Sequence, residues 1–139
     1  MGLFDGMFGS KLEPLDETSA SARAISGAAA FAEFVSKAND RIEVVAGDGA
    51  LYAFVGKPPK AFGLVWFTDE GRLDVRSAME RGLMSREGAA RLVGELGPLY
   101  EASSAAPRYE YRLDGHKVIV ADSADLHSAI ARAVEDAMQ

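Results

Sequence analysis

Two Asp-Gly turns, each set between two β-rich runs, constrain the fold of this chain more than any other feature of its sequence. An Asp-Gly pair favours a tight hairpin because its turn requires positive φ angles, which these two residues tolerate. Each pair therefore predicts two adjacent antiparallel strands. The first hairpin joins residues 41–46 to residues 51–55 across Gly47-Asp48-Gly49, and the second joins residues 109–113 to residues 117–121 across Asp114-Gly115.

A fifth strand and several helices are predicted around these hairpins. Residues 61–68 (AFGLVWFT) are the most apolar run and are predicted to form a central strand, closed by residues 69–72. The break at Gly56–Lys60 before it holds two prolines, which cannot continue a strand. Helical patterns cover residues 19–39, capped by Thr18 or Ser19, and residues 75–81, ended by Gly82. A third pattern covers residues 86–96, capped by Ser85 and ended by Gly97-Pro98. The last helical segment is capped by Asp122 or Ser123.

The predicted order of elements is α-β-β-β-α(α)-β-β-α. It indicates the α+β class, with an antiparallel five-stranded sheet and flanking helices that cover one face. Residues 18–139 are predicted to form a single α+β domain, and residues 1–17 a flexible N-terminal apolar peptide and linker. The order of elements over 18–139 resembles that of the type III secretion chaperones, and roadblock-like and profilin-like domains have similar arrangements. The resemblance implies a short, acidic, dimeric protein that binds another protein.

Composition narrows the classes of function. The chain has 139 residues, a net charge of −6 and no cysteine. This length fits one domain, and the lack of cysteine excludes thiol catalysis, cysteine-ligated zinc, iron–sulfur clusters and disulfides. The acidic balance argues against binding to nucleic acid, since neutralising phosphates requires surplus Lys and Arg. With neither a basic leader nor a run of about 20 apolar residues, we expect a cytoplasmic protein.

No arrangement of reactive residues predicts catalysis. The segment Asp122–Ser128 holds the residue types of a hydrolase triad, but neighbours on one helical turn point in different directions. Its acids are better explained by helix capping and by the helix dipole. Neither His116 nor His127 has a second ligand at metal-binding spacing, and Gly56–Gly63 lacks the Gly-Lys-Ser/Thr of a phosphate loop. We therefore expect no catalytic residue, no cofactor and no metal.

The N-terminal nonapeptide MGLFDGMFG carries the candidate partner-binding residues. On a helix at about 100° per residue, its large apolar side chains fall within roughly 140° of arc. These residues are Leu3, Phe4, Met7 and Phe8. Three glycines disfavour the helix, so we expect it to form only when docked on another protein. A membrane surface is a weaker alternative because the stretch lacks the cations typical of interfacial helices. The remaining alternative is that the peptide packs onto its own domain or frays.

The strand predicted over residues 61–68 is apolar on both of its faces. If helices cover one face of the sheet, something else must bury the other. The alternatives are a second copy of the chain, the N-terminal helix, or residues 1–17. We favour the second copy and therefore predict a homodimer.

Together these observations predict a non-catalytic accessory or adaptor module, chaperone-like, that binds another protein through an exposed sheet face or edge and through the N-terminal peptide. The alternative is a small-molecule-binding domain or small enzyme with a pocket between sheet and helices, and with Tyr109, Tyr111, His116 or His127 at its mouth. A remote alternative is a helix-turn-helix DNA binder. Ala78–Ser85 resembles the first half of that motif, but the second half departs from it.

Overall fold

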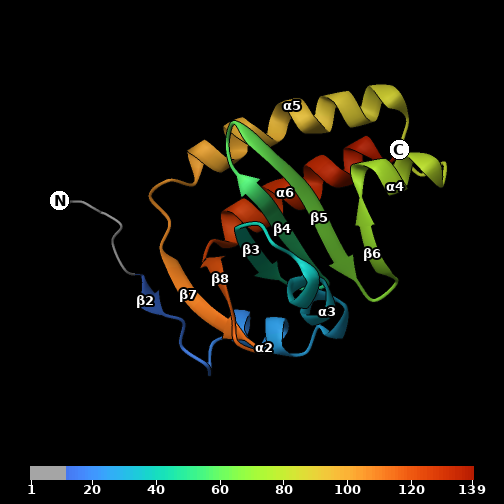
Figure 1. The fold of residues 1–139 in the computed structure, drawn as a ribbon. Coiled ribbons are helices and arrows are strands. Elements are labelled where there is room, and N and C mark those ends of the chain that lie inside the picture. The colour runs from blue at the N-terminus through green and yellow to red at the C-terminus, as the bar shows by residue number, and fades with distance from the viewer. Residues whose placement is uncertain (1–11) are drawn as a thin grey trace.

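The fold is a seven-stranded sheet with helices packed on both faces (Figure 1). It is seen in a computed structural model that describes residues 12–139. The strands are β2 (Glu13–Pro14), β3 (Ile42–Gly47), β4 (Ala50–Lys57), β5 (Ala61–Thr68), β6 (Gly71–Asp74), β7 (Arg108–Leu113) and β8 (His116–Ala121). The helices are α2 (Ala20–Ser26), α3 (Ala29–Lys37), α4 (Val75–Glu80), α5 (Arg86–Ala102) and α6 (Ala124–Ala137).

The sheet is mixed, with its strands in the order β2-β7-β8-β3-β4-β5-β6. Each strand from β3 to β6 is antiparallel to the next one along the chain, and β7 pairs with β8 in the same way. β8 joins β3 in parallel, and β2 joins β7 in parallel. The α+β class is thus confirmed, whereas the antiparallel five-stranded sheet is wrong. The edge strands β2 and β6 have two and four residues, too short to show the alternation by which strands are predicted.

Both Asp-Gly turns form as predicted. Gly49 has a φ of 81°, and the second turn has φ angles of 52° at Asp114 and 84° at Gly115. Only glycine and a few polar residues adopt such angles readily, which is why this pair specifies the turn. The serine caps also form, because the side chains of Ser19, Ser85 and Ser123 each accept a hydrogen bond from a backbone N–H in the first turn of their helix.

The helix expected over residues 19–39 is two helices. Gly27 ends α2, and Ala28 takes a non-helical conformation before α3 begins. The break lets Ile25 and Phe31 both point into the same core. A single straight helix of this length would keep its apolar stripe along one line, whereas two short helices follow the twisted surface of the sheet.

The stop expected at Gly97-Pro98 does not occur, because α5 passes through Pro98 and ends at Ala102. Proline lacks the amide hydrogen that would bond to the carbonyl four residues earlier, so it weakens the helix at this point. Leu99 and Tyr100 follow the proline and pack against the core. Their burial offsets the lost hydrogen bond and keeps the last turn helical.

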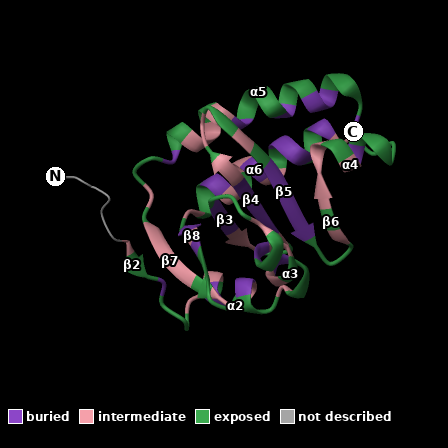
Figure 2. Ribbon diagram, viewed as in Figure 1, coloured by how far each residue is buried: buried purple, intermediate pink, exposed green. Residues whose placement is uncertain are grey.

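Two apolar cores lie on opposite faces of the sheet (Figure 2). Alternate residues of β5 divide between them. Leu64 and Trp66 pack with residues of α4, α5 and α6, whereas Val65 and Phe67 pack with residues of α2 and α3. The expectation that helices cover one face is therefore wrong. The N-terminal helices bury the second face of the central strands, which was one of the alternatives to burial by a second copy.

None of the helices within residues 12–139 is both long enough and apolar enough to cross a membrane.

Candidate functional site

The sequence-predicted site residues that lie within residues 12–139 do not meet in one place. The candidate anchors Leu3, Phe4, Met7 and Phe8 lie outside the described residues, so their role stays a prediction. Of the side chains expected at the mouth of a pocket, Tyr109 and Tyr111 lie on β7 and pack against the core under α2 and α3. His116 is exposed at the start of β8, and His127 lies on α6.

His127 fills a structural position between α6 and the β3–β4 hairpin. Its Nε2 lies 3.0 Å from the Ala50 carbonyl oxygen, and because a carbonyl only accepts, Nε2 carries the proton and donates it. The ring packs on Tyr52, with centroids 5.1 Å apart. A Cβ at Gly47 would lie 2.6 Å from the imidazole, so only glycine allows this approach. The histidine therefore holds α6 against the hairpin.

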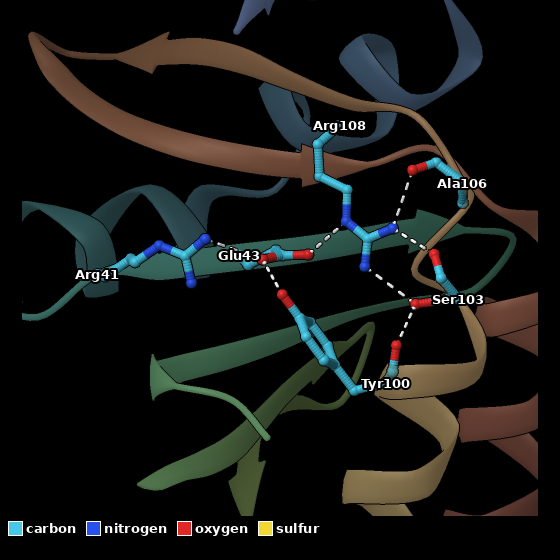
Figure 3. Close-up of polar contacts among 6 residues, drawn as sticks. All are labelled: Arg41, Glu43, Tyr100, Ser103, Ala106 and Arg108. Atoms are coloured by element: carbon cyan, nitrogen blue, oxygen red, sulfur yellow. Dashed lines mark hydrogen bonds and ion pairs between the residues drawn. The ribbon is translucent and has the colours of Figure 1, made fainter. Parts of the chain in front are cut away.

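A buried polar cluster lies where β3, β7 and the end of α5 meet (Figure 3). We define the polar cluster as Glu43, Tyr100, Ser103 and Arg108. The Glu43 side chain is 1% exposed, and each of its oxygens has a close donor. Arg108 Nε donates to Oε2 at 2.8 Å, and the Tyr100 hydroxyl donates to Oε1 at 2.9 Å. Arg41, which is half exposed, lies 3.4 Å from Oε1.

Both terminal nitrogens of Arg108 also donate hydrogen bonds within the protein. Nη1 donates to the carbonyls of Ser103 and Ala106, at 2.6 and 3.0 Å, and Nη2 donates to the Ser103 hydroxyl at 2.9 Å. Burial and the neighbouring Glu43 carboxylate raise the pKa of Tyr100 above its usual 10, so the phenol keeps its proton and remains a donor. All three nitrogens of the Arg108 guanidinium and both oxygens of the Glu43 carboxylate thus contact groups of the protein itself. The polar cluster is therefore a structural tie between β3, β7 and α5.

A groove lies between α5 and the outer edge of β5, and we call it the α5–β5 groove. Its volume is about 590 Å³, within the range of roughly 300–1,000 Å³ typical of ligand sites. Most of the lining is apolar or glycine. The residues that line it are Pro59, Lys60, Phe62, Gly63, Leu64, Val65, Asp74, Val75, Arg76, Val93, Gly94, Leu96, Gly97 and Pro98.

The groove exists because β6 covers only half of β5. β6 pairs with residues 65–68 of β5, and the chain then turns away into α4 at Val75. Within the described residues no strand pairs with the outer side of residues 61–64 (Figure 1). The facing part of α5 carries little bulk: a Cβ at Gly94 would meet nothing within 4 Å. Val93 beside it is 58% exposed, the largest exposure among the large hydrophobic side chains of the described residues.

The charges around the groove are mostly positive. Lys60 and Arg76 line it, together with Asp74. The Asp74 carboxylate is already engaged, because it accepts a hydrogen bond from the Ser77 backbone N–H at 2.8 Å as the cap of α4. Arg76 contacts Glu80 at 3.3 Å on the exposed face of α4, and ion pairs between exposed groups of this kind are weak. The charged side chains among the described residues that line the groove thus carry two positive charges and one negative charge.

Within residues 12–139 there is no group of three or more histidine, aspartate or glutamate side chains placed to hold a metal ion. No family model matches the chain, and no curated protein or solved structure matches it.

The sequence alone did not indicate this groove. Its one signal was the glycine pair Gly94 and Gly97 inside a helical pattern, which is costly for a helix and so suggests that bulk is unwelcome there. Of this pair, the sequence analysis used only Gly97, which together with Pro98 was expected to end the helix. The position of the unpaired half of β5 depends on where β6 stops, which no local pattern reveals.

Proposed function

We propose that this chain is a non-catalytic protein-binding module, and that its α5–β5 groove binds a short extended apolar segment of a partner protein. One observation carries the proposal: the outer side of residues 61–64 of β5 has no partner strand within the described residues, and an apolar groove of about 590 Å³ lies directly beside it. An unpaired strand edge supplies main-chain hydrogen bonds to an added strand, and neighbouring pockets select its side chains.

The same reasoning favours a binding role over catalysis. Glu43 and Ser103, the buried polar side chains among the described residues, hydrogen-bond within the polar cluster, and Nε2 of the half-buried His127 donates to the Ala50 carbonyl. Among residues 12–139, the groove has no pair of titratable groups poised for acid–base work, since the only charged residues of this part of the chain that line it are Lys60, Asp74 and Arg76. The adaptor or chaperone-like role, the homodimer and the anchors Leu3, Phe4, Met7 and Phe8 belong to this proposal.

The proposal is tested with a displayed library of random peptides, selected on the full chain and counter-selected on a variant with a filled groove. Gly94→Leu fills the groove, and the open space at this position lets the variant fold. Gly94→Ala is the matched control, since it adds only a methyl group. We expect selected peptides to be apolar and to bind the wild type and Gly94→Ala but not Gly94→Leu. Peptides that bind all three proteins equally would place the site elsewhere.

A small apolar ligand is the second candidate for the groove, favoured by its volume and by its apolar lining. A ligand at 100 times its dissociation constant adds about 2.7 kcal/mol to the free energy of unfolding. A metabolite panel screened by thermal shift therefore separates the two functions. A metabolite that stabilises the wild type and not Gly94→Leu would replace the peptide as the occupant.

A further inference from the structure

We propose that the segment Leu3–Phe8 of a second copy of this chain occupies the α5–β5 groove, adding a strand beside residues 61–64 of β5. This inference rests on the proposed function of the groove. It states what occupies the groove when no partner protein is bound. Three independent features support it: the side-chain pattern of the segment, its charge, and the distance between the groove and the start of β2.

The side-chain pattern of the segment fits an added strand. Three glycines within residues 1–9 make the nonapeptide a poor helix former. In an extended chain successive side chains alternate between faces, so Phe4 and Phe8 would lie on one side and Leu3 and Met7 on the other. The groove offers apolar contacts on both sides of the β5 edge. Phe62 and Leu64 pack in the core under α4, α5 and α6, and Val65 packs in the core under α2 and α3.

The charge of the segment also fits. Asp5 is the only charged side chain within residues 3–8. The groove is lined by the two cations Lys60 and Arg76, while its one carboxylate, Asp74, is used as a helix cap. Lys60 forms no ion pair with any residue of the described part of the chain. Asp5 would supply the counter-charge for Lys60, between the apolar pairs Leu3-Phe4 and Met7-Phe8.

The geometry of the sheet excludes the chain's own segment as the full occupant. The strand register sets Glu13, Tyr109, Val120, Val44, Ala53 and Val65 in one row across the sheet. Five strand-to-strand steps of about 4.8 Å separate Glu13 from Val65 by roughly 24 Å. Phe8 is five residues before Glu13, and five residues span at most about 18 Å. Phe8 thus reaches the groove only from a second copy.

The proposal has a direct consequence for regulation. Exchange of two identical segments between two identical grooves is reciprocal, so it gives a closed two-fold dimer. A partner's apolar segment must then displace the segment of the second copy. Binding of the partner and dimerisation are therefore predicted to compete, and the groove is shielded from water until a partner is present.

The test uses photocross-linking in the full chain. Phe4 is replaced by p-benzoylphenylalanine, and equal amounts of isotopically light and heavy protein are mixed, equilibrated and irradiated. We expect cross-linked peptides that join position 4 of one isotope to residues 59–65 or 93–98 of the other. Cross-links that join position 4 only to its own chain, or only to residues outside the groove, would overturn the proposal.

The groove variants supply the second readout, by sedimentation velocity. Gly94→Leu is expected to raise the dissociation constant of the dimer at least about tenfold, because it removes a central packed contact. Gly94→Ala is expected to change this dissociation constant by no more than about twofold. Replacing Leu3, Phe4, Met7 and Phe8 together by Ser should match Gly94→Leu. A dimer unaffected by both changes overturns the exchange. If library peptides still bind the wild type and not Gly94→Leu, the proposed function stands while this inference fails.

Discussion

The C-terminal end and the middle of α5 make very different contacts with the sheet. At its C-terminal end the helix meets the polar cluster, in which Glu43, Tyr100 and Arg108 satisfy one another. Along its middle the same helix faces the α5–β5 groove, where glycines leave space and Val93 is exposed. Buried polar groups stabilise a fold when they are hydrogen-bonded to one another, whereas an apolar surface left open beside an unpaired strand is a candidate binding surface. The buried polar contacts of α5 thus lie at its C-terminal end, and its open apolar surface lies along its middle.

The largest expected effect is on the polar cluster. Arg108→Leu leaves the Glu43 carboxylate buried without its closest cation, and loss of one partner of a buried ion pair costs about 3–5 kcal/mol. We expect the free energy of unfolding, measured by urea denaturation, to fall by that amount. The double variant Glu43→Leu/Arg108→Leu removes the orphaned charge and should recover part of the loss. A single variant as stable as the wild type would show that the cluster is not a structural tie.

The Tyr100 hydroxyl is the next largest contribution. Tyr100→Phe removes a hydrogen bond to an ionised carboxylate, which contributes about 1.5–3 kcal/mol. The raised pKa of Tyr100 adds a pH signature, because the folded protein holds this proton more tightly than the unfolded chain. The contribution of this proton to the free energy of unfolding is complete below pH 10. It is lost as the pH rises through the pKa of Tyr100 in the folded protein.

The pH signature is measured by following phenol ionisation at 295 nm and by denaturation across the same pH range. Tyr100→Phe should remove one of the phenols that titrate above pH 10 and make the fall in stability above pH 10 less steep. Tyr52, whose pKa is also raised by burial and by Glu135, is the internal reference that remains in the variant. An unchanged titration curve would contradict the assigned environment of Tyr100.

Two glycines of α5 sharpen the comparison within the helix itself. A Cβ at Gly88 would collide with the Ala137 carbonyl oxygen at the contact between α5 and α6, whereas a Cβ at Gly94 would meet nothing. We expect Gly88→Ala to lower the free energy of unfolding by about 1–3 kcal/mol through overpacking. Gly94→Ala should raise it by about 0.5–1 kcal/mol through helix propensity. Thermal and urea unfolding of the two variants check the opposite signs, and equal effects would contradict an open groove.

Local chemistry decided which parts of this fold were predictable. The Asp-Gly turn at Asp114 and the serine caps act within a few residues, so the sequence alone indicated them. The strand over 61–68 was also predicted with its bounds as observed, because two prolines and an acidic turn delimit it. By contrast, the continuation of α5 past Pro98 depends on the burial of Leu99 and Tyr100 by distant strands.

The sites were harder to predict than the elements, for the same reason. Glu43 lies within an apolar run, and its burial only makes sense once Arg108, 65 positions later, is brought beside it. The groove likewise depends on the position at which β6 leaves β5 for α4. Both features arise from contacts between segments far apart in the sequence, and a local pattern carries no information about them. The N-terminal anchors were predicted from their spacing on a helix, and their role stays a prediction.

The smallest expected effect on stability is the one that best isolates binding. Val93→Ser changes a side chain that is 58% exposed, so the free energy of unfolding should change by no more than about 0.5 kcal/mol. The affinity for a library-selected peptide should nevertheless fall about tenfold, since few contacts carry most of the binding energy. Leu83→Ser is the matched control, because Leu83 is 37% exposed and does not line the groove. Fluorescence anisotropy with the labelled peptide measures both variants. Equal losses of affinity in the two would mean that general surface hydrophobicity, and not the groove, attracts the peptide.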